Sequence, residues 1–177
     1  AIMNRALVFV LAYFLSTASF AKEQAPLFDT DAIAFLTNEQ DMSRRLGGSA
    51  IELSEHLKQL KLAGVTFVSS MNEAPKVNGA YVVIIKPGKR SKILVHTLGK
   101  EPNQEFINGL STALQSVEPP VVLEGPIALS ISFRTWPKGS FPFPYVGVSA
   151  LYRAIDNAPE SASAETLIEL AWPDDDG

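Results

Sequence analysis

Two β-branched runs on either side of a tight turn constrain the fold of this chain more than any other feature. Residues 80–86 (AYVVIIK) and 92–98 (KILVHTL) flank a Pro-Gly-Lys-Arg turn at 87–90. Runs of this composition, joined through glycine, are typical of paired antiparallel strands. The sequence therefore predicts a β-hairpin in the middle of the chain, against which the other elements must pack.

Helical patterns precede the hairpin. Thr37 and Ser49 are each followed three residues later by a glutamine or a glutamate, which is the spacing of a capping box. The first pattern predicts a short helix to Leu46, which could also begin nearer Asp31. The second predicts a longer helix over 50–63, ended by the glycine that follows it.

Five further elements complete the predicted order. They are a short strand at 65–68, a helix over 102–116, a strand at 126–134, a helix at about 149–157 and a last strand at 166–172. The strand at 126–134 alternates large apolar residues with small or polar ones. This alternation predicts one buried face and one face in contact with water.

The order of these elements predicts an α+β fold, with an antiparallel sheet of about four to five strands and helices packed mainly on one face. The chain has no cysteine, so apolar packing rather than disulfides must hold it together. Residues 22–177 are long enough to bury a core of their own. We expect them to form a single domain that ends in an acidic tail at 174–177.

The residues numbered 1–21 have the composition of a secretory signal peptide. A basic start at Arg5 precedes an apolar run at 6–15, and the small residues Ser19 and Ala21 then prepare a cleavage site. The apolar run is shorter than the roughly 20 residues that span a bilayer. We therefore expect cleavage before Lys22, no stable membrane span afterwards, and a periplasmic or secreted bacterial protein.

Composition disfavours several classes of function. Arg5 is the one charged residue of the predicted leader. After cleavage the chain would have 14 basic and 19 acidic residues, a net charge of −5. Nucleic-acid binding needs concentrated Lys and Arg instead. The lack of cysteine removes thiolate metal sites and thiol nucleophiles. We therefore expect no nucleic-acid partner, no metal and no cofactor.

The two histidines, His56 and His96, are the first residues to consider for catalysis. No HxxxH or HxH spacing marks a metal site, and no GxSxG motif marks a nucleophilic serine. A serine–histidine–acid triad can still assemble from distant positions. We interpret both histidines as structural or surface residues of a non-catalytic protein, with a periplasmic hydrolase of dispersed catalytic residues as the alternative.

The tip of the predicted hairpin concentrates positive charge in an acidic protein. Its four basic residues are Lys86, Lys89, Arg90 and Lys92. Such a tip can simply keep a turn soluble and resistant to aggregation. It can also attract an acidic partner, a lipid headgroup or a cell-wall polymer. Lys89 and Arg90 are therefore candidate partner-binding residues.

The segment 136–147 is the second candidate for partner binding. It combines three prolines with four aromatic residues, Trp136, Phe141, Phe143 and Tyr145. Proline cannot donate to a strand ladder, so the segment is not a central strand. Rigid aromatic side chains on a proline-stiffened chain suit a contact loop. The alternative is that the same rings cover the sheet as part of the core.

Residues 79–134 show a recognisable order of motifs. GAYVVIIKPGKRSKILVHTLG is followed by NQEFINGLSTALQSVEPP and GPIALSISF, which give a hairpin, a helix, a Pro-Pro break and an alternating strand. This order resembles the C-terminal domains of TonB and TolA. The resemblance implies a non-catalytic periplasmic binding module, since TonB presents its sheet edge to partner peptides. We therefore expect a module of the cell envelope that binds a protein through a sheet edge or the 136–147 segment.

Overall fold

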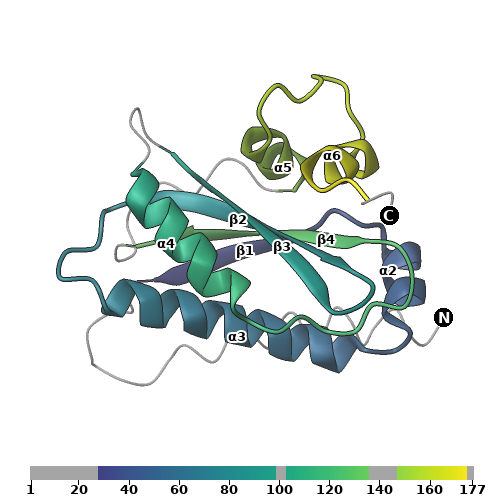
Figure 1. The fold of residues 1–177 in the computed structure, drawn as a ribbon, viewed down its shortest axis with the longest axis horizontal. Coiled ribbons are helices and arrows are strands. Elements are labelled where there is room, and N and C mark those ends of the chain that lie inside the picture. Colours follow the sequence, from purple (N-terminus) through teal and green to yellow (C-terminus); the bar gives the residue numbers. More distant parts are fainter. Residues whose placement is uncertain (1–27, 99–102, 136–146, 175–177) are drawn as a thin grey trace.

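The computed structural model describes residues 28–98, 103–135 and 147–174, and Figure 1 shows their arrangement. The elements are β1 (Asp29–Phe35), α2 (Glu39–Leu46), α3 (Ala50–Ser69), β2 (Asn78–Lys86), β3 (Arg90–Thr97), α4 (Gln104–Gln115), β4 (Ile127–Arg134), α5 (Val148–Ala154) and α6 (Ala164–Ala171). The four strands form one antiparallel sheet in the order β1-β4-β2-β3. The predicted α+β class with an antiparallel sheet is confirmed.

The predicted hairpin is present as β2 and β3. The two strands pair without interruption from Gly79 opposite Thr97 to Lys86 opposite Arg90. Gly88 and Lys89 of the turn both have positive φ, at 83° and 55°, and glycine adopts this conformation without steric cost. β2 lies between β3 and β4, and all of its residues are buried.

The first face of the sheet packs against the two longest helices, α3 and α4 (Figure 1). This first core contains large side chains from both layers, including Tyr81, Val83, Ile85, Leu129 and Phe133 from the sheet and Leu60, Phe106, Leu110 and Leu114 from the helices. Phe28 stacks on Phe133 with 5.2 Å between ring centroids. Phe106 in turn lies 5.8 Å from Phe67. Apolar burial on this scale is the main source of stability in a chain without disulfides.

The second face of the sheet is covered by α5 and α6, which lie on the opposite side from α3 and α4 (Figure 1). β4 is therefore buried on both faces, and the predicted water-facing side of that strand is wrong. Its serines are satisfied inside the protein. The hydroxyl of Ser130 accepts the N–H of Gly147 at 2.8 Å, and that of Ser132 accepts the N–H of Ala32 at 2.9 Å.

Helix α3 continues through Gly64 to Ser69, so the predicted helix end and the predicted strand at 65–68 are wrong. Gly64 allows close packing instead. A Cβ placed there would lie 2.4 Å from Cε1 of Phe28. The glycine thus admits the Phe28 ring against the helix, at the usual cost of glycine to helix propensity.

Two elements differ in type from their prediction. The segment 166–172, predicted as a strand, belongs to α6, whose start is capped by the Ser163 hydroxyl accepting the N–H of Thr166. The region near Asp31, considered as a helix start, is strand β1 paired with β4. In both places long-range contacts, and not the local pattern of seven or eight residues, determine the secondary structure.

The two predicted capping boxes are also wrong in detail. Helix α2 begins after Asn38, whose side chain accepts the N–H of Asp41 at 2.9 Å. The Thr37 hydroxyl instead accepts the N–H of Ala128 at 2.9 Å, which ties the start of β4 to the chain entering α2. Ser49 precedes α3 but makes no capping hydrogen bond through its side chain.

The remaining predicted helices are confirmed as α4 and α5. Asn103 caps α4 by accepting the N–H of Phe106 at 2.9 Å, and α5 begins directly after Gly147. Within the described ranges, no helix has both the length and the apolar character that crossing a membrane would require.

Candidate functional site

Strand β3 forms one edge of the sheet, because among the described residues it pairs with β2 alone. The direction of its backbone groups follows from two hydrogen bonds. Leu98 donates its N–H toward β2, to the carbonyl of Asn78 at 2.8 Å. Ile93 donates away from β2, to Oε1 of Gln115 at 3.0 Å. Since backbone groups alternate along an antiparallel strand, Val95 also directs its N–H and C=O to the open side.

Gln115 closes the first half of this edge. Its Nε2 donates to the carbonyl of Ser91 at 2.6 Å and to the Ser91 hydroxyl at 3.2 Å, while its Oε1 accepts the N–H of Ile93. One amide side chain at the end of α4 thus binds the outward groups that a neighbouring strand would bind. This contact protects the part of β3 that is nearest the turn.

The second half of the edge is not closed in this way. Across the described ranges, the outward N–H and C=O of Val95 have no hydrogen-bond partner. Thr97 has the same direction but is only 8% exposed. The accessible stretch is therefore centred on Val95, between Ile93 and Thr97.

Side chains from two helices flank this stretch. Helix α4 runs along β3 on the first face (Figure 1). Ser111 and Ile107 precede Gln115 by four and eight residues, so they continue its line along the helix. On the second face α5 contacts β3, and Arg153 lies near enough to His96 to affect its titration.

The opposite edge, β1, is built differently. The pairing of β1 with β4 shifts register between Thr30 and Ile33. Its two acidic residues contact Arg134, at 3.2 Å for Asp29 and 2.7 Å for Asp31. Irregular pairing and charge are features that protect an edge from adding another strand. The regular edge of β3 is therefore the better template.

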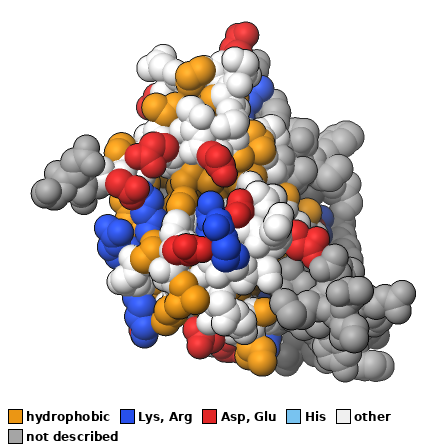
Figure 2. All heavy atoms as spheres, turned by 90° about the vertical axis from the view of Figure 1, so that its right-hand side faces the viewer, with side chains coloured by type: hydrophobic (Ala, Val, Ile, Leu, Met, Phe, Trp, Pro, Cys, Tyr) orange, Lys and Arg blue, Asp and Glu red, His pale blue; other side chains and the backbone are white. Residues whose placement is uncertain are grey.

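The two basic candidates at the hairpin tip both contact other parts of the protein. Lys89 lies 2.6 Å from the carboxylate of Glu118, and this hydrogen bond raises the pKa of Lys89 and lowers that of Glu118. Arg90 donates to the carbonyl of Pro87 at 3.0 Å and lies over the Trp172 ring, 5.7 Å from its centroid. Figure 2 views this end of the molecule, where Lys and Arg side chains lie among Asp and Glu side chains.

The four aromatic candidates, Trp136, Phe141, Phe143 and Tyr145, lie outside the described residues. Whether that segment binds a partner or covers the sheet therefore stays a prediction. The structure adds only that the described chain resumes at Gly147, whose N–H is held by Ser130 of β4.

The two histidines lie in separate environments. His56, on α3, is 4% exposed, and its Nδ1 lies 3.0 Å from the carbonyl of Glu118. Its Nε2 is buried and has no hydrogen-bond partner within the described part of the chain. Burial lowers the pKa of His56. Burial and then the charge of Arg153 lower the pKa of His96, on β3. In the part of the chain that is described, no three His, Cys, Asp or Glu side chains gather as a metal site would require.

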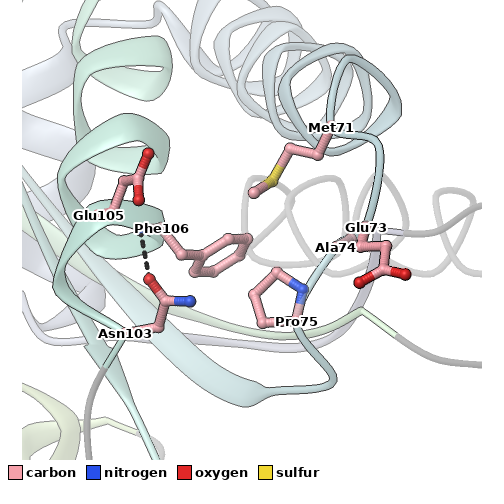
Figure 3. A pocket seen from close by; sticks show the side chains of 7 residues that line it. All are labelled: Met71, Glu73, Ala74, Pro75, Asn103, Glu105 and Phe106. Carbon is pink, nitrogen blue, oxygen red and sulfur yellow. Dashed lines mark hydrogen bonds between the residues drawn. The ribbon is translucent and has the colours of Figure 1, made fainter.

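Two shallow pockets lie away from both histidines. The first, of about 370 Å³, is drawn in Figure 3, where Met71 and Phe106 point toward one another beside Pro75, with Glu73 and Glu105 at the margin. The second, of about 460 Å³, separates α6 from the start of β4 and from α2. Neither pocket contains a histidine, so neither shows the base next to a nucleophile that a hydrolase of this kind needs.

Comparison with known proteins places this site in no family: no family model, no curated protein and no solved structure matches the chain. Function must therefore be argued from the geometry of the edge. The sequence predicted that a sheet edge could bind a partner, but it did not identify β3, Val95 or the role of Gln115. A glutamine at the end of a helix carries no local signal for such a role, because the role depends on where the helix packs.

Proposed function

We propose that this protein is an exported, non-catalytic protein-binding module of the cell envelope, which binds an extended segment of its partner along β3. The observation that carries the proposal is the asymmetry of the β3 edge. Gln115 binds the outward groups at Ser91 and Ile93, whereas those of Val95 have no partner among the described residues. An added strand would hydrogen-bond to the open stretch, as in other cases of strand addition.

The location in the envelope is supported by sequence alone. A basic residue, a short apolar run and small residues before Lys22 form the pattern of a cleaved leader. The resemblance of residues 79–134 to the C-terminal domains of TonB and TolA supports the same reading, since TonB presents a sheet edge to partner peptides. If the leader is removed as proposed, N-terminal sequencing of the protein from an envelope fraction will begin at Lys22. A protein that retains Met3 in the inner membrane would contradict this.

The open stretch is short, which sets what the partner must supply. Each backbone hydrogen bond contributes only about 0.5–1.5 kcal/mol net. The carbonyl of Ile93 and the N–H and carbonyl of Val95 can form two or three of them, since the N–H of Ile93 is already bound by Gln115. The partner must therefore also contact side chains beside the edge, and Ile107 on the α4 side and the exposed Leu98 are two apolar side chains that it can reach.

Amide hydrogen exchange tests whether the edge is open in the free protein. The N–H of Val95 points outward, whereas those of Leu94 and His96 point to β2. We expect Val95 to exchange much faster than both neighbours and faster than Ile93, which donates to Gln115. If Val95 exchanges as slowly as its neighbours, another part of the chain covers the edge and the proposal fails.

Val95→Pro tests whether the edge binds the partner. Proline at this position removes an outward N–H and leaves the ladder to β2 intact, which edge strands tolerate. We expect the variant to fold and to lose capture of envelope proteins in a pull-down followed by mass spectrometry. Val95→Ala is the matched control, because it removes similar side-chain contacts and keeps the N–H. Equal capture by all three proteins would move the binding surface elsewhere, first to the 136–147 segment.

A further inference from the structure

Three basic residues of the hairpin tip contact the C-terminal end of α6. Nζ of Lys86 donates to the carbonyl of Trp172 at 2.7 Å and to the carboxylate of Asp174 at 2.5 Å. Nζ of Lys92 donates to the carbonyl of Ala171 at 2.6 Å. Lys86 and Arg90 also lie 5.0 and 5.7 Å from the centroid of the Trp172 ring. The positive tip thus binds the negative end of the helix dipole, a carboxylate and an aromatic face.

Lys86 is unusual among these residues because it is only 2% exposed. It continues the alternation of Ala80, Val82 and Ile84, whose side chains form the second core. An apolar residue would suit this position, since replacing a buried ion pair by apolar side chains is often neutral or stabilising. Because the ammonium group of Lys86 needs hydrogen-bond acceptors, the packing of α6 over the sheet depends on the oxygen atoms near that group. Asp174, the first residue of the predicted acidic tail, supplies one of them, and its side chain is 72% exposed to water and salt.

The rest of α6 is attached less extensively. Leu167 and Ile168 are its buried residues, and both lie in the second core. On the side of α6 that faces α2, a pocket of about 460 Å³ separates Ile168 and Glu165 from Arg45 and Pro126. The helix is therefore held by Leu167 and Ile168, by its contacts with α5 and by the contacts at its C-terminal end.

We propose that residues 148–174, which include α5 and α6, are a releasable cover over the second face of the sheet. Its latch consists of the contacts that Lys86 and Lys92 make with residues 171–174. Release would uncover the apolar strip of Ala80, Val82, Ile84 and Ala128 while the first core stays intact. This inference goes beyond partner binding at β3 and does not depend on it.

The first test weakens the latch at its exposed member. Asp174→Asn keeps an acceptor oxygen but removes the negative charge that meets Lys86. Charge-assisted hydrogen bonds are roughly twice as strong as neutral ones, so the loss of the charge can change an opening equilibrium by about tenfold. We expect amides of α6 to exchange about tenfold faster in Asp174→Asn, with no change in α4 and β4. About 1 M NaCl should accelerate the same amides in the unchanged protein, because salt screens the exposed carboxylate. No acceleration, or equal acceleration in all elements, would overturn the proposal.

The second test asks whether the packing of α6 over the second face depends on the charge of Lys86. Lys86→Met places an apolar side chain of similar length in the second core. We expect α6 in this variant to exchange no faster than in the unchanged protein, and to respond neither to salt nor to an added Asp174→Asn change. Lys89→Met is the matched control at the same tip, since Lys89 contacts Glu118 and not α6. If Lys86→Met releases α6 as strongly as Asp174→Asn, the lysine is a structural contact only and the proposal is wrong.

Discussion

The two faces of the sheet are covered by helices of different length and by side chains of different size. On the first face, α3 and α4 have 20 and 12 residues, and the sheet offers them large side chains such as Tyr81 and Phe133. On the second face, α5 and α6 have 7 and 8 residues, and β2 and β4 offer them Ala80 and Ala128. Helices this short depend on tertiary contacts for their stability.

This difference predicts an order of stability within the molecule. Regions with few buried apolar contacts open with a lower free energy than the global unfolding free energy. The first core joins three aromatic side chains of the sheet and its N-terminal flank, with Phe133 between Phe28 and Tyr81. The second core has smaller buried side chains, three of them alanines, and a buried lysine at its margin. We therefore expect the second face to open first.

The largest effect should come from truncating the first core. Leu110 of α4 is fully buried there, so Leu110→Ala should lower the free energy of global unfolding by about 2–5 kcal/mol, measured by urea denaturation. Ile168→Ala is the matching change on the second face. It should mainly accelerate amide exchange in α5 and α6. If exchange in α4 and β4 rises equally in Ile168→Ala, both faces unfold together and the comparison fails.

The next effect concerns the close packing of α3 against the chain before β1. In Gly64→Ala the new methyl group would overlap the Phe28 ring, whose stacking on Phe133 must then shift. Overpacking of this kind usually costs about 1–3 kcal/mol, despite the better helix propensity of alanine. Leu62→Ala, at an exposed position of the same helix, should change the unfolding free energy by less than about 0.5 kcal/mol. A stabilised Gly64→Ala would show that the ring moves freely.

Gly64 also explains part of what the sequence could and could not predict. The hairpin, α4 and β4 follow from strong local patterns that agree with their tertiary contacts, and each was predicted within a few residues. Gly64 gives the local signal of a helix end, but a ring more than thirty residues away in sequence uses the space it leaves. The strand β1 exists through its pairing with β4, which no local pattern encodes.

The candidate site was predictable to a smaller degree. A hairpin implies that one of its strands can be an edge, and this much was expected. Which strand remains open depends on the order of the sheet, and how far it is open depends on Gln115, 22 residues from Ile93. The basic tip was read as a surface feature because the sequence does not show that α6 folds back over Lys86.

A third test uses pH to probe the first core. Burial lowers the pKa of His56, whereas the unfolded chain binds a proton at about pH 6.5. The contribution of neutral His56 to the free energy of unfolding is therefore complete above about pH 6.5. As the pH decreases below about 6.5, this contribution decreases by at most about 1.4 kcal/mol per pH unit. Protonation would place an N–H at Nε2, for which the described residues offer no acceptor. Urea denaturation at about pH 7.5 and pH 5.5 should show a larger loss for the unchanged protein than for His56→Gln. An equal loss would assign the pH dependence to other groups.

The smallest expected effect lies at the edge where the two faces meet. Gln115→Ala removes the side chain that binds the outward groups of Ser91 and Ile93. Because Gln115 is exposed and water can replace it, the change should cost no more than about 1 kcal/mol. Its clearer consequence is local: the amide of Ile93 should exchange as fast as that of Val95, while Leu94 stays protected by β2. Gln115→Glu keeps an acceptor for the N–H of Ile93 but loses the donor to Ser91. We therefore expect an exchange rate at Ile93 between those of the unchanged protein and Gln115→Ala. If Ile93 stays protected in Gln115→Ala, the packing of α4 itself shields the edge, and the open stretch of β3 is defined by the whole helix rather than by one side chain.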